Sequence, residues 1–259
     1  MLLHYRLQGH GPAILLLHGL FGSLDNLGVL VRDLQRDHCV VAVDLRNHGR
    51  SFHDSQMDYP SMVTDLIALL QHLSLPSVTV IGHSMGGKAA MAMALLAPQW
   101  LERLVVLDIA PVAYSSSRHQ PLFAAFAEIA ALDIKQRQVA AQILRAASIN
   151  EGIIQFLLKS FDNGQWRFNW PVLEQCYPAI SGWGISGQWL GPSCFIGGQR
   201  SDYLLVDYHP QVKQQFPQSV LHSLPEAGHW LAAEQPDAVL AIIRRFFSEP
   251  ILPRNSGTI

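Results

Sequence analysis

Short apolar runs recur along the chain, separated by longer stretches that have an apolar residue at every third or fourth position. The short runs do not alternate polar and apolar residues, which is typical of strands covered by helices on both faces of a parallel sheet. The pattern therefore predicts an α/β architecture with a mostly parallel central sheet and helices on both faces. Leu2–Leu7 is expected to add an antiparallel edge strand. The expected parallel strands are Ala13–Leu17, Cys39–Val43, Val78–Ile81, Leu104–Leu107, Cys194–Ile196 and Ser219–Leu221.

Two of the intervening helices have recognisable start signals. Ser61 is expected to cap a helix whose apolar stripe runs from Met62 to Leu73. Pro236 suits the first turn of a last helix, because the N–H that proline lacks has no helical partner at that position. Strand, helix and strand in succession are what a doubly wound sheet requires.

Residues 113–190 do not follow this alternation of strands and helices. It lacks a convincing strand of the parallel type, and it holds four of the six tryptophans. Because it follows a strand that ends at Asp108, we expect a helical cap over a site at the carboxyl edge of the sheet. A plain helical subdomain with an aromatic core is the alternative. The expected organisation is a core of residues 1–112 and 191–250, a cap of residues 113–190 and a flexible tail of residues 251–259.

Composition narrows the class of protein. Hydrophobic residues make up 49% of the chain and charged residues 15%, against a usual charged share of about 25%, so the chain can bury a large core. The formal net charge is -2 and no segment is strongly basic. This charge distribution argues against nucleic acid or an anionic membrane surface as a partner.

The N-terminal segment and the cysteines indicate the cellular compartment that is expected for the protein. The longest aliphatic run near the start, Ala13–Leu17, is far shorter than the roughly 20 residues of a membrane helix, and no signal-peptide pattern precedes it. Cys39, Cys176 and Cys194 are odd in number and far apart. We therefore expect a cytoplasmic protein with free, buried thiols, and neither a disulfide nor a cysteine metal site.

A candidate nucleophile stands out at Gly82-His83-Ser84-Met85-Gly86. This G-x-S-x-G pattern follows an apolar strand and opens a helical stretch, which is the context of a nucleophile elbow. The serine of such an elbow sits on a sharp turn, where strand and helix come so close that the positions two before and two after it must be glycine. We therefore predict that Ser84 is a catalytic nucleophile.

A serine hydroxyl needs a base beside it, and His229 is the best candidate. It lies in a loop between the last expected strand and the last helix, after the serine in chain order. His18 and His83 flank the site and are expected to have supporting roles. The twelve histidines show no H-E-x-x-H or comparable ligand spacing, so no metal is expected.

An oxyanion hole requires two backbone N–H groups aimed at the developing charge. Met85, directly after the nucleophile, is one expected donor. The other should come from the loop that follows an early strand, and Leu20 in the segment His18–Gly22 is the expected residue.

The acid that orients the histidine has two candidates. Asp108 and Asp202 both follow an expected strand, and the usual place of this acid falls on Ser201, which cannot supply the charge. We favour Asp108 as the acid and Ser201 as its hydrogen-bonding neighbour, with Asp202 as the alternative. Two other polar features are interpreted as structural. The loop Asp44–Ser51 is expected to be pinned by local hydrogen bonds and an Asp–Arg contact. Lys88 is expected to lie on a helix surface.

Seven segments, spread over nearly the whole chain, carry a family signal: His18–Asn26, Arg46–Gly49, Gly82–Lys88, Asp108–Pro111, Ile154–Phe161, Trp166–Asn169 and Ala227–Trp230. Together they resemble the small bacterial esterases of the YbfF type, in the α/β-hydrolase superfamily. The resemblance implies the α/β-hydrolase fold with a small helical cap, and a cofactor-independent esterase or acyl-thioester hydrolase. It also implies that Asp108 serves in the catalytic set, with Ser201 at the usual acid position. The chain departs from the family pattern at Asp202, an additional acid, so both aspartates remain candidates.

Together these features predict a serine carboxylesterase or acyl-thioesterase that acts on small acyl esters through an acyl-enzyme on Ser84. No cofactor is expected, and the oligomeric state is left open. Two rival functions use the same scaffold. A lyase, C–C hydrolase or acyltransferase would keep the Ser84–His229 pair, and a non-catalytic receptor would keep only the pocket.

Overall fold

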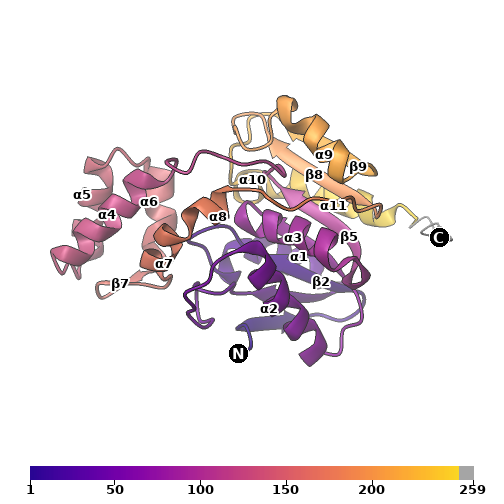
Figure 1. The fold of residues 1–259 in the computed structure, drawn as a ribbon, viewed down its shortest axis with the longest axis horizontal. Coiled ribbons are helices and arrows are strands. Elements are labelled where there is room, and N and C mark those ends of the chain that lie inside the picture. The colour runs from indigo at the N-terminus through magenta and orange to yellow at the C-terminus, as the bar shows by residue number, and fades with distance from the viewer. Residues whose placement is uncertain (251–259) are drawn as a thin grey trace.

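The computed structural model describes residues 1–250, and the tail expected at residues 251–259 lies outside the described residues. Seven strands form one twisted sheet in the order β1-β3-β2-β4-β5-β8-β9 (Figure 1). All neighbours in it are parallel except β1, which pairs antiparallel with β3 at the edge. The strands are β1 Tyr5–Gln8, β2 Ala13–Leu17, β3 Cys39–Val43, β4 Val78–His83, β5 Leu101–Leu107, β8 Ser193–Gly198 and β9 Ser219–Leu224.

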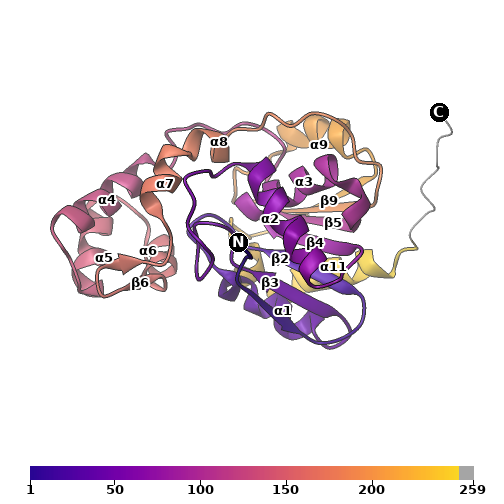
Figure 2. The same ribbon diagram turned by 60° about the horizontal axis from the view of Figure 1, so that its bottom comes forward.

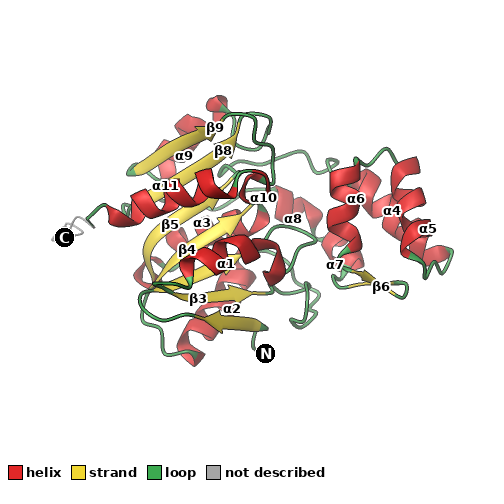
Figure 3. Cartoon of the chain, turned by 180° about the vertical axis from the view of Figure 1, so that it is seen from behind, coloured by secondary structure: helices red, strands yellow, loops and turns green. Residues whose placement is uncertain are grey.

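Helices pack on both faces of the sheet (Figure 3). One face carries α1, α10 and α11, and the other carries α2, α3 and α9. The predicted fold class, a mostly parallel sheet with helices on both faces, is confirmed. The helices of this part are α1 Gly28–Leu34, α2 Tyr59–His72, α3 Met85–Leu96, α9 His209–Gln215, α10 Leu231–Glu234 and α11 Pro236–Ser248, with short 3₁₀ turns at Leu24–Leu27, Pro98–Trp100 and Val206–Tyr208.

A helical cap is inserted between β5 and β8 and lies beside the sheet (Figure 2). Its core is aromatic: the Phe126 ring lies 4.8 Å from Trp166 and 5.4 Å from Phe168, measured between ring centroids. A short antiparallel hairpin, β6–β7, contributes Phe161 and Trp166 to this cluster. The elements of the cap are α4 Gln120–Ala131, α5 Arg137–Ala146, α6 Glu151–Leu158, β6 Phe161–Asp162, β7 Gln165–Trp166, α7 Trp170–Gln175 and α8 Tyr177–Ser181.

The start of α2 differs from the expectation. The helix begins at Tyr59, and the Asp58 side chain caps it by accepting a 2.8 Å hydrogen bond from the Ser61 N–H. Ser61 is therefore inside the first turn, and its prediction as the cap was wrong. The physical reason is that Pro60 fits the first turn, where its fixed φ favours the helix, so the helix starts before the serine.

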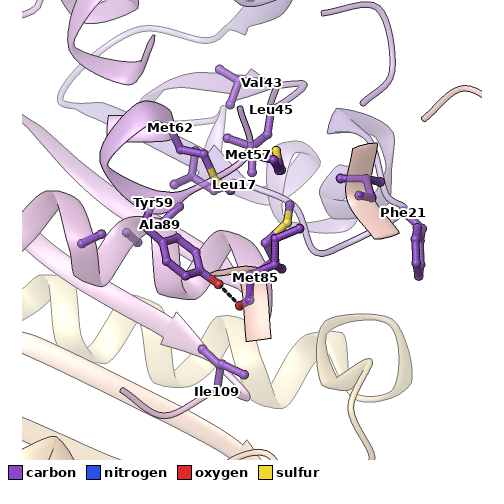
Figure 4. Close-up of a cluster of buried hydrophobic side chains, with 14 of the residues drawn as sticks. Leu17, Phe21, Val43, Leu45, Met57, Tyr59, Met62, Met85, Ala89 and Ile109 are labelled. Atoms are coloured by element: carbon purple, nitrogen blue, oxygen red, sulfur yellow. Dashed lines mark hydrogen bonds between the residues drawn. The ribbon is translucent and has the colours of Figure 1, made fainter. Parts of the chain in front are cut away.

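The buried face of the sheet beneath α2 and α3 joins the core to the site. Leu17, Met62, Met85 and Ile109 belong to one hydrophobic cluster that reaches the carboxyl ends of β2, β4 and β5 (Figure 4). Among residues 1–250, no helix is long and apolar enough to cross a bilayer. Cys39, Cys176 and Cys194 carry free thiols; Cys194 is buried, whereas Cys39 and Cys176 are only half-buried, contrary to the expectation.

The cap core yields a stability prediction. Phe126 is fully buried, so Phe126→Ala should lower the free energy of unfolding by about 3–5 kcal/mol through lost burial and a cavity. Glu128→Ala, at an exposed position of the same helix, serves as the control and should change it by no more than about 0.5 kcal/mol. Urea unfolding of both variants measures the difference, and equal stabilities would show that the cluster does not stabilise the cap.

Candidate active site

Ser84 occupies the turn between β4 and α3 in a left-handed backbone conformation, with φ of 53°. The two flanking glycines allow this turn to form. A Cβ atom at Gly82 would lie 2.2 Å from the Gly86 carbonyl oxygen, and one at Gly86 would lie 2.4 Å from the Leu17 carbonyl oxygen. Any side chain at either position would push strand and helix apart. The spacing of the G-x-S-x-G segment therefore has a steric cause in this structure.

His229 lies between Ser84 and Asp108. Its Nε2 is 3.0 Å from Ser84 Oγ, and its Nδ1 is 2.7 Å from Asp108 Oδ2. The histidine comes from the loop between β9 and α10, and the aspartate follows β5 directly. A carboxylate at Nδ1 holds the proton on that nitrogen, so the Nε2 lone pair faces the serine hydroxyl. The serine then donates its hydrogen bond to His229.

The two candidate acids have different surroundings. Asp108 is fully buried, and its carboxylate accepts hydrogen bonds from the Gly198 N–H at 3.0 Å and from the Ser201 hydroxyl. Asp202 lies at the rim of the site, where its side chain is 61% exposed and pairs with Arg118. The Arg118 hydrogen bond holds the pKa of Asp202 below its usual value. The structure thus brings Asp108 and Ser201, and not Asp202, to the histidine.

Two further residues position His229, one through its ring and one through its backbone. The Tyr203 ring stacks on it with centroids 4.0 Å apart, and His83 Nε2 lies 2.8 Å from the His229 carbonyl oxygen, to which it donates. Burial, followed by the neighbouring His229, lowers the pKa of His83 to about 3, so His83 remains neutral. Tyr203 was missed in the sequence, where its position two residues after Ser201 was the only available signal.

The expected oxyanion donors line the space beside Ser84. Within residues 1–250, neither the Leu20 N–H nor the Met85 N–H donates a hydrogen bond to another group of the protein. Phe21, directly after Leu20, has a left-handed backbone with φ of 62°. This strained conformation turns the chain sharply at the donor, as functional loops commonly do.

Two contacts hold Phe21 and therefore the loop His18–Gly22, which carries the expected donor Leu20. The Phe21 N–H donates a 3.1 Å hydrogen bond to His48 Nε2. The Phe21 ring lies among cap aromatics, with its centroid 5.0 Å from Phe168 and 5.3 Å from Phe126. The loop that carries one expected donor is thus fixed by the core on one side and by the cap on the other.

The loop Asp44–Ser51, which carries His48, is held by contacts with the core and with the cap. The Asp44 carboxylate accepts from the Leu24 and Arg50 N–H groups at 2.7 and 2.9 Å, which pins the loop locally. The expected Asp–Arg contact joins this loop to helix α2: Arg46 of the loop donates two hydrogen bonds, of 2.6 and 2.8 Å, to the buried Asp65 of the helix. The same loop also contacts the cap, since the Gly49 N–H donates to the Arg167 carbonyl at 2.7 Å.

Lys88 was expected on a helix surface, and this prediction was wrong. Its side chain is only 1% exposed, and its ammonium donates to the carbonyls of Ser181 and Gly182 at 2.8 and 2.9 Å. Helix α3 is apolar on all sides, so it is buried all round and offers no polar face. Burial lowers the pKa of Lys88 to about 7.

A cleft of about 910 Å³ opens above the serine. It is lined by Ser84 and His229 from the core and by Ile153 and Phe156 from α6 of the cap. A volume of this size is typical of small-molecule sites. In the part of the chain that the structure describes, no group of three or more histidine, cysteine, aspartate or glutamate side chains could hold a metal ion.

The contact between His48 and Phe21 predicts a pH dependence of stability. Burial, with a smaller effect of His18, lowers the pKa of His48 to about 3. Between pH 6.5 and 3 the unfolded chain therefore binds a proton at this residue that the folded chain does not. This residue should lower the free energy of unfolding by up to about 1.4 kcal/mol for each pH unit of acidification in that window.

His48→Gln removes the titration and keeps an oxygen that can accept from the Phe21 N–H. Its free energy of unfolding, measured with urea from pH 7 to pH 4, should fall less steeply than that of the unmodified protein. Parallel curves for the two proteins would contradict the assignment of a neutral, accepting His48.

Comparisons with known proteins agree with this fold. The family model described as alpha/beta hydrolase fold matches residues 12–137. A protein of Escherichia coli (strain K12) named esterase YbfF is 50% identical over 242 residues, which cover 93% of this chain and 95% of that protein. A mouse protein named sn-1-specific diacylglycerol lipase ABHD11 is 35% identical over 92% of this chain and 81% of its own length.

The solved structures include one titled marine microorganism esterase. It is 34% identical to this chain, covers 95% of it and 99% of its own length, and superposes with a TM-score of 0.89. The likeness spans the core and the cap together, and not only the segment that the family model matches. The chain therefore belongs to the alpha/beta hydrolase family, and within it to the group that resembles the YbfF-type esterases.

Proposed function

We propose that the protein hydrolyses carboxylic esters through an acyl-enzyme on Ser84. The observation that carries this proposal is the position of the His229 imidazole, 3.0 Å from the Ser84 hydroxyl on one side and 2.7 Å from the Asp108 carboxylate on the other. The similarity to proteins named as esterases supports an ester as the substrate. The chemistry then follows from the donors and acceptors of the site.

In the first half-reaction, Ser84 Oγ attacks the ester carbonyl carbon while its proton passes to His229 Nε2. The carbonyl oxygen becomes an oxyanion, which the Leu20 and Met85 N–H groups stabilise. Asp108 stays ionised and stabilises the imidazolium. His229 then gives its proton to the leaving oxygen, the C–O bond breaks, and the acyl group remains on Ser84 as an ester.

In the second half-reaction, water takes the place of the departed alcohol. His229 accepts a proton from the water as it attacks the acyl carbonyl, and the same N–H groups stabilise the second oxyanion. Collapse of this intermediate returns the proton to Ser84 Oγ and releases the carboxylic acid. The cycle uses only groups of this chain and water.

Thioesters fall under the same proposal. The attacking and stabilising groups act on the carbonyl, which oxygen esters and thioesters share. The thiolate departs without needing a proton, and it can afterwards take up the proton that His229 received from Ser84. Rates for a matched pair, such as phenyl acetate and phenyl thioacetate, would give the preference between the two bonds.

Removal of the nucleophile is the first test. Ser84→Ala should lower kcat for an aryl acetate by on the order of 10⁴-fold or more, because the serine and histidine act as a unit. Ser116→Ala, at an exposed serine, is the matched control and should keep the rate of the unmodified protein. Comparable turnover by Ser84→Ala and the control would refute the acyl-enzyme.

The acid is tested by two amide substitutions. Asp108→Asn should reduce kcat by on the order of 10⁴-fold, because an amide at this position favours the wrong imidazole tautomer. Asp202→Asn should change kcat no more than a few-fold, since Asp202 binds Arg118 and not His229. Measurement of kcat for both variants distinguishes the two candidate acids. A loss of activity in Asp202→Asn alone would show that Asp202, and not Asp108, is the acid.

A further inference from the structure

His119 is a titratable residue of the site that the proposed mechanism does not use. It directly precedes helix α4 of the cap, and it lines both the large cleft and a small space that adjoins the cleft at Ser84. Both expected oxyanion donors, Leu20 and Met85, line the same small space. The cap therefore brings an imidazole to the wall that is expected to face the oxyanion.

Two aromatic rings contact the His119 imidazole in edge-to-face geometry. The centroid of Phe21 lies 6.0 Å from that of the imidazole, and the centroid of Tyr177 lies 5.2 Å from it. Phe21 directly follows Leu20 in the chain. The imidazole is thus packed between helix α8, which begins at Tyr177, and the loop that carries one expected oxyanion donor.

The hydrogen bond between His119 and Tyr177 decides which nitrogen of the imidazole carries the proton. The Tyr177 hydroxyl is bonded to His119 Nδ1 and has no other hydrogen-bond partner among residues 1–250. Burial raises the pKa of Tyr177, and burial, followed by the neighbouring Arg118 and His229, lowers the pKa of His119 to about 4. Both groups are therefore neutral at pH 7. The buried hydroxyl needs an acceptor for its proton, and this acceptor is Nδ1, so the imidazole carries its own proton on Nε2.

The Nε2–H group of His119 is free to bind a ligand. Among residues 1–250 no hydrogen bond joins it to another group of the protein. It is not sealed in the interior either, since the buried side-chain atoms without a partner belong to Trp166, Trp189, Ser193 and Ser219. Because His119 lines the site, we infer that Nε2–H faces the space where a substrate would bind.

We propose that His119 is a further catalytic residue, whose Nε2–H donates a hydrogen bond to the oxyanion beside the Leu20 and Met85 N–H groups. The inference rests on the proposed function, since it needs the oxyanion that attack by Ser84 creates. No proton is transferred to or from His119. A neutral imidazole can donate to a developing oxyanion, whereas a cationic one would repel the His229 imidazolium that forms in the same step.

Helix α8 fixes the position of Tyr177, and thereby that of the imidazole. The last residue of this helix, Ser181, accepts a 2.8 Å hydrogen bond from the buried Lys88 ammonium. The Tyr59 hydroxyl donates to the Ile180 carbonyl of the same helix at 2.5 Å (Figure 4). Tyr177 is thus a positioning residue, because it acts on the oxyanion only by holding the tautomer of the imidazole.

Two amide substitutions distinguish the two nitrogens of the imidazole. The amide nitrogen of His119→Gln can occupy the place of Nε2, whereas the shorter amide of His119→Asn reaches only the place of Nδ1. For an aryl acetate, His119→Asn should lower kcat by on the order of 10²-fold and change KM no more than a few-fold, because one oxyanion donor is lost. His119→Gln should keep kcat within about tenfold of the unmodified protein. His10→Asn, at an exposed histidine outside the site, is the control and should keep the full rate.

A pair of ketones tests the oxyanion contact without turnover. Benzyl trifluoromethyl ketone adds to an activated serine and forms an oxyanion, whereas benzyl methyl ketone remains a carbonyl compound. His119→Asn should raise the Ki of the fluorinated ketone by about the factor by which kcat/KM falls, because only that adduct resembles the transition state. The Ki of the methyl ketone should change no more than a few-fold. A role of His119 in packing alone would change both Ki values equally.

Tyr177→Phe provides a test that leaves His119 in place. Without the hydroxyl, the imidazole can carry its proton on either nitrogen, so kcat should fall a few-fold while KM is unchanged. Thermal unfolding shows whether each variant is folded. If His119→Asn does not fold, an unchanged kcat in folded Tyr177→Phe would by itself overturn the inference.

The outcomes separate this inference from the proposed function. An unchanged kcat in His119→Asn, or equal losses in His119→Asn and His119→Gln, would overturn the role of His119 and leave the acyl-enzyme on Ser84 standing. Equal changes in the Ki of the two ketones would do the same. Failure of the unmodified protein to hydrolyse any ester would overturn the proposed function and this inference with it.

Discussion

The His229 imidazole must be held between two oxygen atoms on opposite sides, and the pairing of β4 with β5 makes this possible. His83 is paired with Leu107 in the sheet, so the residues that follow, Ser84 and Asp108, leave adjacent strands at the same level. Both have a left-handed backbone, with φ of 53° and 52°. The two strands end in equivalent sharp turns, and these place a hydroxyl and a carboxylate within reach of one ring from a third loop.

The cap contacts the candidate site directly, because it helps to hold the loop of the expected oxyanion donor Leu20 in place. Phe21 follows that donor, and its ring packs in the aromatic core of the cap, while its N–H is bound by His48 from the core. Lys88 joins the other end of the cap to the nucleophile helix. Movement of the cap would therefore disturb both the loop that carries Leu20 and the helix that follows Ser84.

Local patterns predicted the sheet, the elbow and His229, because each depends on short-range sterics or on chain order. They did not decide between Asp108 and Asp202, since both residues follow strands. Only the position of β5 in the sheet, between β4 and β8, shows which carboxylate faces inward. Lys88 was misjudged because a lone charge usually marks an exposed face, and its carbonyl partners lie more than 90 residues away. The roles of Tyr203 and Phe21 also depend on tertiary contacts that no local pattern encodes.

The central claim is that Ser84 is a nucleophile activated by His229. A fluorophosphonate probe, which forms a covalent bond to activated serines, tests it most directly when the labelled peptide is identified by mass spectrometry. The account predicts a single adduct on the peptide that carries Ser84, formed orders of magnitude more slowly in His229→Ala. No adduct, an adduct on another serine, or equal labelling rates in the two proteins would contradict it.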